Sequence, residues 1–169
     1  MTTSELLLQD YDIEIAMTRR ILQSVPEGNP GYKCHDKSMP LGKLTMHVAT
    51  LPTFGKTILT TPSLNMADPG HQWPDLTFTT RDHALATFDA AASDCRAALA
   101  ACTDATLAEP WKFSFGDNVI SNSPRSLAYR HMCVNHLIHH RAQLGVYLRL
   151  NDIPVPGVYG PSADEPFTP

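Results

Sequence analysis

The stretch NHLIHHRAQLGVYLRLNDIP, residues 135–154, decides the fold and raises the main question about function. Its leucines recur at helical spacing, so we predict a long helix that packs one face against a core. Three histidines fall within five positions of this helix, namely His136, His139 and His140. Imidazoles are polar, and burying them is costly unless each finds a partner. The question is therefore what these side chains bind.

Two of these histidines lie on the same face of the predicted helix. Helical residues turn by about 100° each, so positions four apart lie one above the other. His136 and His140 have this spacing. Two imidazoles one turn apart can hold a single transition metal ion at about 2.0–2.1 Å per bond. His139 projects about 60° from His136, on the flank of the helix. We therefore predict His136 and His140 as a metal-binding pair.

A pair of histidines on one helix usually needs a third ligand from another element, and His47 is the best candidate. It lies three residues after Leu44 and four before Leu51, so it belongs to the inward face of its own predicted helix. A shared metal ion would give each buried imidazole a partner. We predict a metal site formed by His47, His136 and His140. The alternative is that His47 is an ordinary core histidine.

The neighbours of these histidines leave other arrangements open. Cys133 lies one turn before His136 and could be a fourth ligand, or form a site with His136 and His140 in place of His47. As a small buried hydrophobe it needs no function. Gln143 could orient a ligand or a water molecule, or be an ordinary exposed helix residue.

Five further residues have two interpretations each. Tyr147 could line the pocket or pack in the core. His139 and Arg141 could hydrogen-bond across the packed helices or a dimer seam, or be solvated. Trp73 and Trp111 lie in irregular connections and could roof the site or cover the ends of the core.

The rest of the chain predicts further helices and one hairpin. Apolar residues at three- and four-residue steps indicate helices over residues 4–24, from about residue 38, over 80–102 and over 123–151. The stretch WKFSFGDNVISNS, residues 111–123, predicts a short hairpin or extended loop before the last helix. The fold class is therefore all-α, a four-helix bundle in a single domain of residues 1–169. Its Pro-rich end, residues 153–169, is predicted to be an extended tail.

Composition and charge argue against several classes of protein. The 169 residues carry a net charge of -4, and no basic stripe indicates a nucleic-acid partner. No window of about 18 uncharged apolar residues predicts a membrane span. The N-terminal residues lack the positive region of a signal peptide, and the four cysteines lack CxxC spacing. We therefore expect a cytoplasmic protein with reduced thiols.

Two segments resemble a known protein family. HLIHHRAQLGVYLRLNDIPVP, residues 136–156, is similar to the closing-helix signature of the DinB/YfiT-like metalloenzymes, in which a His-rich turn runs into HRxQ, a YLR stretch and a Pro-containing exit. LGKLTMHVATLP, residues 41–52, is similar to the family's second-helix segment, which carries its first metal-binding histidine. Helix order and loop placement extend the resemblance over nearly the whole chain, but only these two segments match closely.

This resemblance implies a fold, a metal and an assembly. The implied fold is an up-down-down-up four-helix bundle, often a homodimer, with His47, His136 and His140 as ligands, in agreement with the spacing argument. The implied cofactor is a divalent transition metal, foremost nickel or zinc, with iron or manganese as further candidates. Characterised relatives include thiol S-transferases and a thiol-dependent isomerase. Nothing in this sequence is diagnostic of one particular thiol.

Three neutral ligands point to a catalytic rather than a structural metal site. Structural zinc is normally closed by four protein ligands, whereas three leave a coordination position open. An ion held in this way can lower the pKa of water or a thiol toward neutrality. Our hypothesis is a metal-dependent hydrolase or thiol S-transferase acting on a small molecule, with a thiol among the candidates. One alternative is a non-catalytic metal- or ligand-binding bundle, and the lack of an identifiable general base is an argument for it. The other alternative is a purely structural dimerising bundle.

Overall fold

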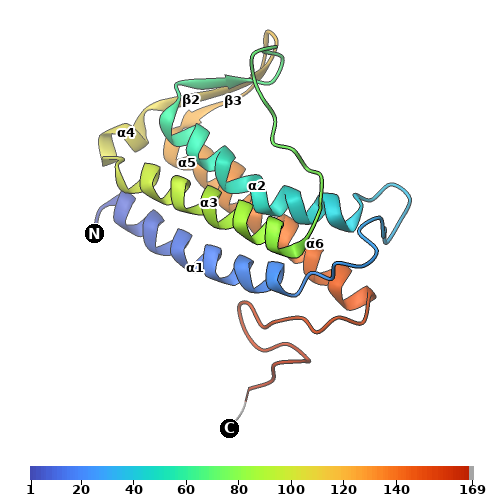
Figure 1. Cartoon of the computed structure of the whole chain (residues 1–169). Helices are drawn as coiled ribbons and strands as arrows, with labels where there is room; N and C mark the ends of the chain where they lie inside the picture. Colours follow the sequence, from blue (N-terminus) through green and yellow to red (C-terminus); the bar gives the residue numbers. More distant parts are fainter. Residues whose placement is uncertain (168–169) are drawn as a thin grey trace.

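The computed structural model describes residues 1–167, and most of them are helical (Figure 1). In chain order the elements are α1 (Thr3–Gln23), α2 (Leu41–Thr60), β1 (Ser63–Asn65), α3 (Arg81–Ala100), α4 (Asp104–Ala108), β2 (Pro110–Phe115), β3 (Asn118–Pro124), α5 (Arg125–Tyr129), η1 (Arg130–Asn135) and α6 (His136–Leu150). The long helices lie side by side, with α3 against both α1 and α2, and α6 against the same two helices. The helices expected from the sequence are therefore present.

The first helix begins with a capping box formed by Thr2 and Glu5. The Thr2 hydroxyl accepts a hydrogen bond from the Glu5 backbone N–H at 3.1 Å, and the Glu5 carboxylate accepts one from the Thr2 N–H at 2.7 Å. This reciprocal capping box satisfies two donors that a helix start leaves free. The third long helix is capped in a similar way, because the Thr80 hydroxyl accepts from the N–H of His83 at 3.0 Å.

The helix that carries His47 begins without a side-chain cap. It starts at Leu41, slightly later than expected. The Leu41 N–H donates to the carbonyl of Tyr32 at 2.8 Å, and the Gly42 N–H donates to that of Pro30 at 2.8 Å. The preceding loop thus supplies the acceptors that a capping side chain would give. Pro30 lies so near that a Cβ on Gly42 would be 2.9 Å from its Cβ, so a side chain at this position would push the loop away.

The prediction of a mostly helical fold is confirmed, but the chain is not all-α, because a three-stranded sheet lies at one end of the helices. The order is β1-β2-β3, with β1 parallel to β2 and β2 antiparallel to β3. The β2–β3 pair is the hairpin predicted before the last helix, and Trp111 pairs with Ser123 in it. The strand that the sequence did not predict is β1, in which Leu64 pairs with Phe113. Three residues are too few to show a two-residue alternation.

The last helical segment is continuous but not uniform. It begins at Arg125, whose N–H donates to the carbonyl of Glu109 at 2.8 Å, so residues 123 and 124 end a strand instead of starting the helix. Residues 130–135 form a π-helical turn directly before His136. A π turn spaces its hydrogen bonds by five residues instead of four, and such turns occur frequently at functional sites. The turn therefore shifts the helix faces, so that residues before it no longer align with the residues after it that a regular α-helix would place on the same face.

The core follows the inward stripes predicted from the sequence. Leu44 and Leu51, which flank His47 on α2, are 2% and 4% exposed. They belong to a buried cluster that also includes Phe88 of α3 and Leu144 of α6. A second cluster surrounds Trp111, near the sheet. The stripe on which His47 lies therefore faces the interior.

The described residues after α6 form no helix or strand and lie against α1 and α6. Arg20 of α1 forms an ion pair with Glu165 at 2.6 Å, and Arg149 of α6 forms one with Asp164. Residues 168 and 169 of the predicted tail lie outside the described residues. Along the part of the chain that the structure describes, no helix combines the length and the apolar character that a membrane crossing requires.

Candidate metal centre

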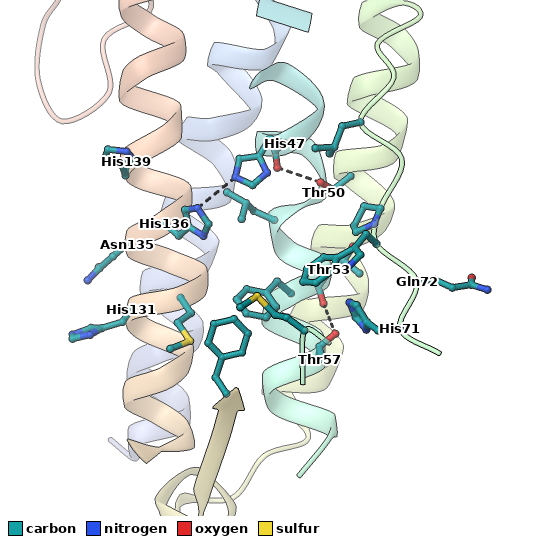
Figure 2. A pocket seen from close by; sticks show the side chains of 18 residues that line it. His47, Thr50, Thr53, Thr57, His71, Gln72, His131, Asn135, His136 and His139 are labelled. Carbon is teal, nitrogen blue, oxygen red and sulfur yellow. Dashed lines mark hydrogen bonds between the residues drawn. The ribbon is translucent and has the colours of Figure 1, made fainter. Parts of the chain in front are cut away.

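Three histidine side chains from two helices meet at one point. His47 comes from α2, and His136 and His140 lie one turn apart on α6. The Nε2 atoms of His136 and His140 are 2.9 Å apart, and those of His47 and His136 are 3.4 Å apart. The ring centroids of His47 and His140 are 4.5 Å apart. Figure 2 shows the rings of His47 and His136 turned toward one another between the two helices.

The separations between these nitrogens suit one shared ion. Two nitrogens bound at 2.0–2.1 Å are about 2.9 Å apart when the angle at the ion is 90°, and about 3.4 Å apart at the tetrahedral angle. The observed separations of 2.9 and 3.4 Å match these values. Ligand atoms of all three histidines lie within 4.8 Å of one another, and residues 1–167 contain no other such group of His, Cys, Asp or Glu. The donor set therefore fits a divalent transition metal.

Hydrogen bonds orient two of the rings. The Gln143 Oε1 atom lies 2.8 Å from Nδ1 of His140. An amide oxygen only accepts, so the His140 proton lies on Nδ1 and the Nε2 lone pair faces the other histidines. The backbone N–H of His136 donates to the carbonyl of Cys133, and the Met132 backbone hydrogen-bonds the His136 ring. The π turn thus contributes to the orientation of His136.

Burial keeps the three imidazoles neutral. It is the largest cause that lowers the pKa of His47 to about 4, and the neighbouring rings of His140 and His136 lower it further. Burial also lowers the pKa of His136 and of His140, although the hydrogen bond from His140 to Gln143 acts in the opposite direction. Metal binding requires the neutral imidazole, so burial prepares these side chains as ligands at neutral pH.

Two of the three histidines lie in the wall of a cavity of about 790 Å³ (Figure 2). His47 and His136 line it directly. The remaining wall comes from α2, from the loop between β1 and α3, from β2 and from η1, and includes Phe54, Trp73 and Phe113. A cavity of this size holds a drug-sized molecule. The three-histidine cluster is therefore accessible to a small ligand.

The alternative site with Cys133 is not formed. Cys133 is buried and absent from the histidine cluster. Its thiol and that of Cys95 both lie against Gly55 of α2. A Cβ at Gly55 would be 2.5 Å from the Cys133 sulfur and 2.7 Å from the Cys95 sulfur, so the two thiols are neighbours. The alignment of Cys133 with His136 and His140 assumed a regular α-helix, and the π turn at residues 130–135 breaks that regularity.

Of the other candidate residues, some line the cavity and others are buried in the core. Trp73 lines the cavity, as does the exposed His139, whose Nε2 atom lies 3.1 Å from the Gln143 amide nitrogen. Trp111 is fully buried and donates from Nε1 to the Thr61 hydroxyl at 3.4 Å. Tyr147 is also buried outside the cavity lining.

One alternative for Arg141, a hydrogen bond across the packed helices, is confirmed on the opposite side of α6, where it takes the form of a buried ion pair. Arg141 is not solvated and contacts α1 instead, because its Nη1 atom lies 2.7 Å from a carboxylate oxygen of Glu14 and their side chains are 3% and 6% exposed. Arg141 also donates to the hydroxyls of Thr18 and Tyr159. A signal was present, since Glu14 and Thr18 continue the helical face of Tyr11.

Comparisons with known proteins support the fold. No family model matches this sequence, and no curated protein matches it. The structure is similar to the crystal structure of a DinB-like protein from Bacillus cereus ATCC 10987, with a TM-score of 0.65 and 20% sequence identity. The match covers 90% of this chain and 95% of that chain. The chain therefore has a DinB-like fold.

Proposed function

We propose, from the DinB-like fold and the three converging histidines, that this protein is a metal-dependent enzyme. In this proposal His47, His136 and His140 bind a divalent transition metal ion, nickel or zinc, for hydrolysis or thiol transfer on a small molecule. Bound there, such an ion supplies a Lewis acid that lowers the pKa of water or of a thiol. The observation that carries the proposal is the convergence of three Nε2 atoms at the wall of a cavity.

The chain's own residues contribute orientation and access. Burial keeps the three imidazoles neutral, so their lone pairs are available without loss of a proton. Gln143 fixes the tautomer of His140, which is the usual task of a hydrogen-bond partner behind a metal ligand. Among residues 1–167 three protein ligands converge, and a shell of three leaves room for a substrate atom from the side of the cavity.

One observation favours a second candidate, a metal- or ligand-binding protein without turnover. Among the described residues that line the cavity there is no Asp or Glu, the side chains that most often act with histidine as general bases. This candidate shares the metal site and differs only in turnover. It is distinguished by assay of the metal-loaded protein on model esters, amides and thiol conjugates.

The test is metal content and turnover in single variants. We expect wild-type protein, purified without a His-tag, to contain one divalent ion per chain, and His47→Ala, His136→Ala and His140→Ala each to lose it. The control is His83→Ala, because His83 is an exposed residue of α3 outside the cluster. Stoichiometric metal in all three site variants would contradict the proposal. If His140→Ala does not reduce turnover, the turnover does not come from this metal site, and the site would then be one of binding without catalysis.

The same proposal includes an assembly and a compartment. We propose a single domain with up-down-down-up helices, which is supported by Figure 1, where α1 and α6 run one way and α2 and α3 the other. A homodimer follows from the sequence resemblance and is tested by light scattering coupled to gel filtration. A cytoplasmic location is supported by four cysteines that are all unpaired.

A further inference from the structure

The cavity wall carries no charged side chain. Among the described residues that line it, none is Asp, Glu, Lys or Arg. The polar residues Gln72, His131, Asn135 and His139 are exposed, so they lie at the rim and remain in contact with solvent. Figure 2 shows Gln72 and His131 pointing away from the space between the helices. A charged ligand group placed deep in the cavity would therefore lose its water without gaining an ion-pair partner.

Two of the three threonines of α2 that line the cavity add no free donor. Thr50, Thr53 and Thr57 line the cavity. The Thr50 hydroxyl donates to the carbonyl of Met46 at 2.9 Å, and the Thr57 hydroxyl donates to that of Thr53 at 3.1 Å. Hydroxyl groups that bond back to their own helix have used their hydrogen. At Thr50 and Thr57 the groups left for a ligand are methyls and an oxygen lone pair.

Aromatic rings form a fixed part of the wall. The rings of Phe54 and Phe113 lie 5.8 Å apart, and Phe113 stacks on Trp111 at 5.9 Å with an angle of 15° between the ring planes. Trp111 is fully buried, so it holds this pair in place from behind. Trp73 lies on the loop between β1 and α3 and is 56% exposed, so it has unburied ring surface to offer a ligand.

We infer that the cavity takes drug-sized molecules whose body is uncharged and apolar, with one polar head placed at the three histidines. The inference names the substrate class of the proposed metal centre, and it rests on the proposed function for the role of the head. The body is specified by the wall itself, through the aromatic residues and the lack of charge. Molecules that carry a phosphate or another charged group on the body, away from the head, are excluded as substrates.

The test uses probes that differ only in head or body. Biphenyl-4-hydroxamic acid supplies an uncharged body with a metal-binding head. Its 4′-sulfonate analogue adds a negative charge to the body, and its 4′-trimethylammonium analogue adds a positive charge. Biphenyl-4-carboxamide lacks the metal-binding head, and it is made with the same two charged substituents. Binding of each probe to metal-free and zinc-loaded protein is measured by calorimetry. We expect both charged hydroxamates to bind at least about tenfold more weakly than the neutral one, because charge in the body goes unpaired.

The outcomes separate this inference from the proposed function. Charged analogues of both signs that bind within about threefold of the neutral probe would overturn the inference, even if the protein holds metal and turns over substrates. Failure of the neutral carboxamide to bind at all would also overturn it. A further outcome is that zinc fails to strengthen hydroxamate binding while the protein still binds the neutral carboxamide more tightly than its charged forms. In that case the metal proposal fails and the inference about the body stands.

Variants locate the probe. Trp73→Ala removes an exposed ring from a loop, and Phe113→Ala removes one from the fixed wall. We expect each to weaken the neutral carboxamide at least about fivefold, since each removes apolar contact area. The matched control is Phe115→Ala, because Phe115 lies on the same strand, is 59% exposed and does not line the cavity. Equal weakening in the control, or none in Trp73→Ala, would contradict binding at this wall.

Discussion

The two sides of α6 both carry buried or half-buried polar side chains, but only one side is closed by protein partners. On one side Arg141 meets Glu14, Thr18 and Tyr159, and each contact is a hydrogen bond or an ion pair. On the other side His136 and His140 face His47 with Nε2 atoms that have no partners among residues 1–167 except one another. Polar groups that the fold has satisfied hold the structure together, whereas groups left facing one another at a cavity wall are available to a ligand.

The largest loss of stability is expected when the buried ion pair between Arg141 and Glu14 is removed. Arg141→Ala leaves Glu14 buried without its partner, and removing one member of a buried pair typically costs about 3–5 kcal/mol. We expect the free energy of unfolding in urea to fall by this amount. The double variant Glu14→Leu/Arg141→Met should recover most of the loss, because it removes both charges. If Arg141→Ala is no less stable than metal-free His136→Ala, the two sides do not differ as described.

The close approach of α2 to the π turn is expected to matter next. A Cβ at Gly55 would lie 2.5 Å from the Cys133 sulfur and 2.7 Å from that of Cys95. We expect Gly55→Ala to lower the free energy of unfolding by about 2 kcal/mol, because the core is overpacked. Metal affinity should fall as well, since the change pushes α2 away from the last helical segment.

Gly145→Ala is the matched control for that change. Gly145 lies on α6, where a Cβ would meet only Val155 Cγ1 at 3.7 Å, an ordinary contact. We expect this variant to be as stable as the wild type or slightly more stable, because alanine favours helix. Equal loss of stability in Gly55→Ala and Gly145→Ala would show that the contact with the two thiols is not the cause.

A smaller effect is expected at the hydrogen bond behind the site. Gln143→Leu removes the acceptor that holds the Nδ1 proton of His140. Loss of such a partner typically weakens metal binding, and we expect about a tenfold rise in the dissociation constant, measured by competition with a chelator. Gln143→Glu keeps an acceptor at this position and should retain the affinity. Unchanged affinity in Gln143→Leu would mean that this contact does not orient the ligand.

The smallest effect is the pH dependence of the metal-free protein. The unfolded chain protonates histidine near pH 6.5, but folded His47 has a pKa of about 4 and those of His136 and His140 are also lowered. Between these values the unfolded chain binds more protons, so stability rises with pH and is lost as pH falls from about 6.5 toward 4. Allowing for solvent screening, we expect about 1 kcal/mol from His47, and a shallower slope in His47→Leu. Equal slopes in both proteins would contradict the burial of this ring.

Local patterns in the sequence predicted the helices and the three histidines, because helical periodicity depends only on neighbouring residues. His47 was found from its place between Leu44 and Leu51, and His136 and His140 from their four-residue spacing. Features that depend on contacts between distant segments were missed, or were left as one alternative among several. The pairing of Arg141 with Glu14 joins α6 to α1, and β1 is a strand only because Leu64 lies beside Phe113.

The π turn explains why the alternative site with Cys133 is not formed, whereas the interpretation of Cys133 as a small buried hydrophobe is confirmed. Cys133 was placed on the face of His136 by a constant rotation of about 100° per residue. Residues 130–135 depart from that rotation, and Cys133 instead lies beside Cys95 in the core. Nothing in the periodicity of the sequence marks such a turn. The pairing of His136 with His140 was unaffected, because both lie in α6 after the turn ends.

The most direct measurement is anomalous X-ray diffraction from crystals of untagged protein grown with zinc or nickel. The account predicts one anomalous peak between α2 and α6, about 2.0–2.1 Å from the Nε2 atoms of His47, His136 and His140. A peak bonded to other side chains, or a His47 ring turned away from the other two with the crystal saturated in metal, would contradict it.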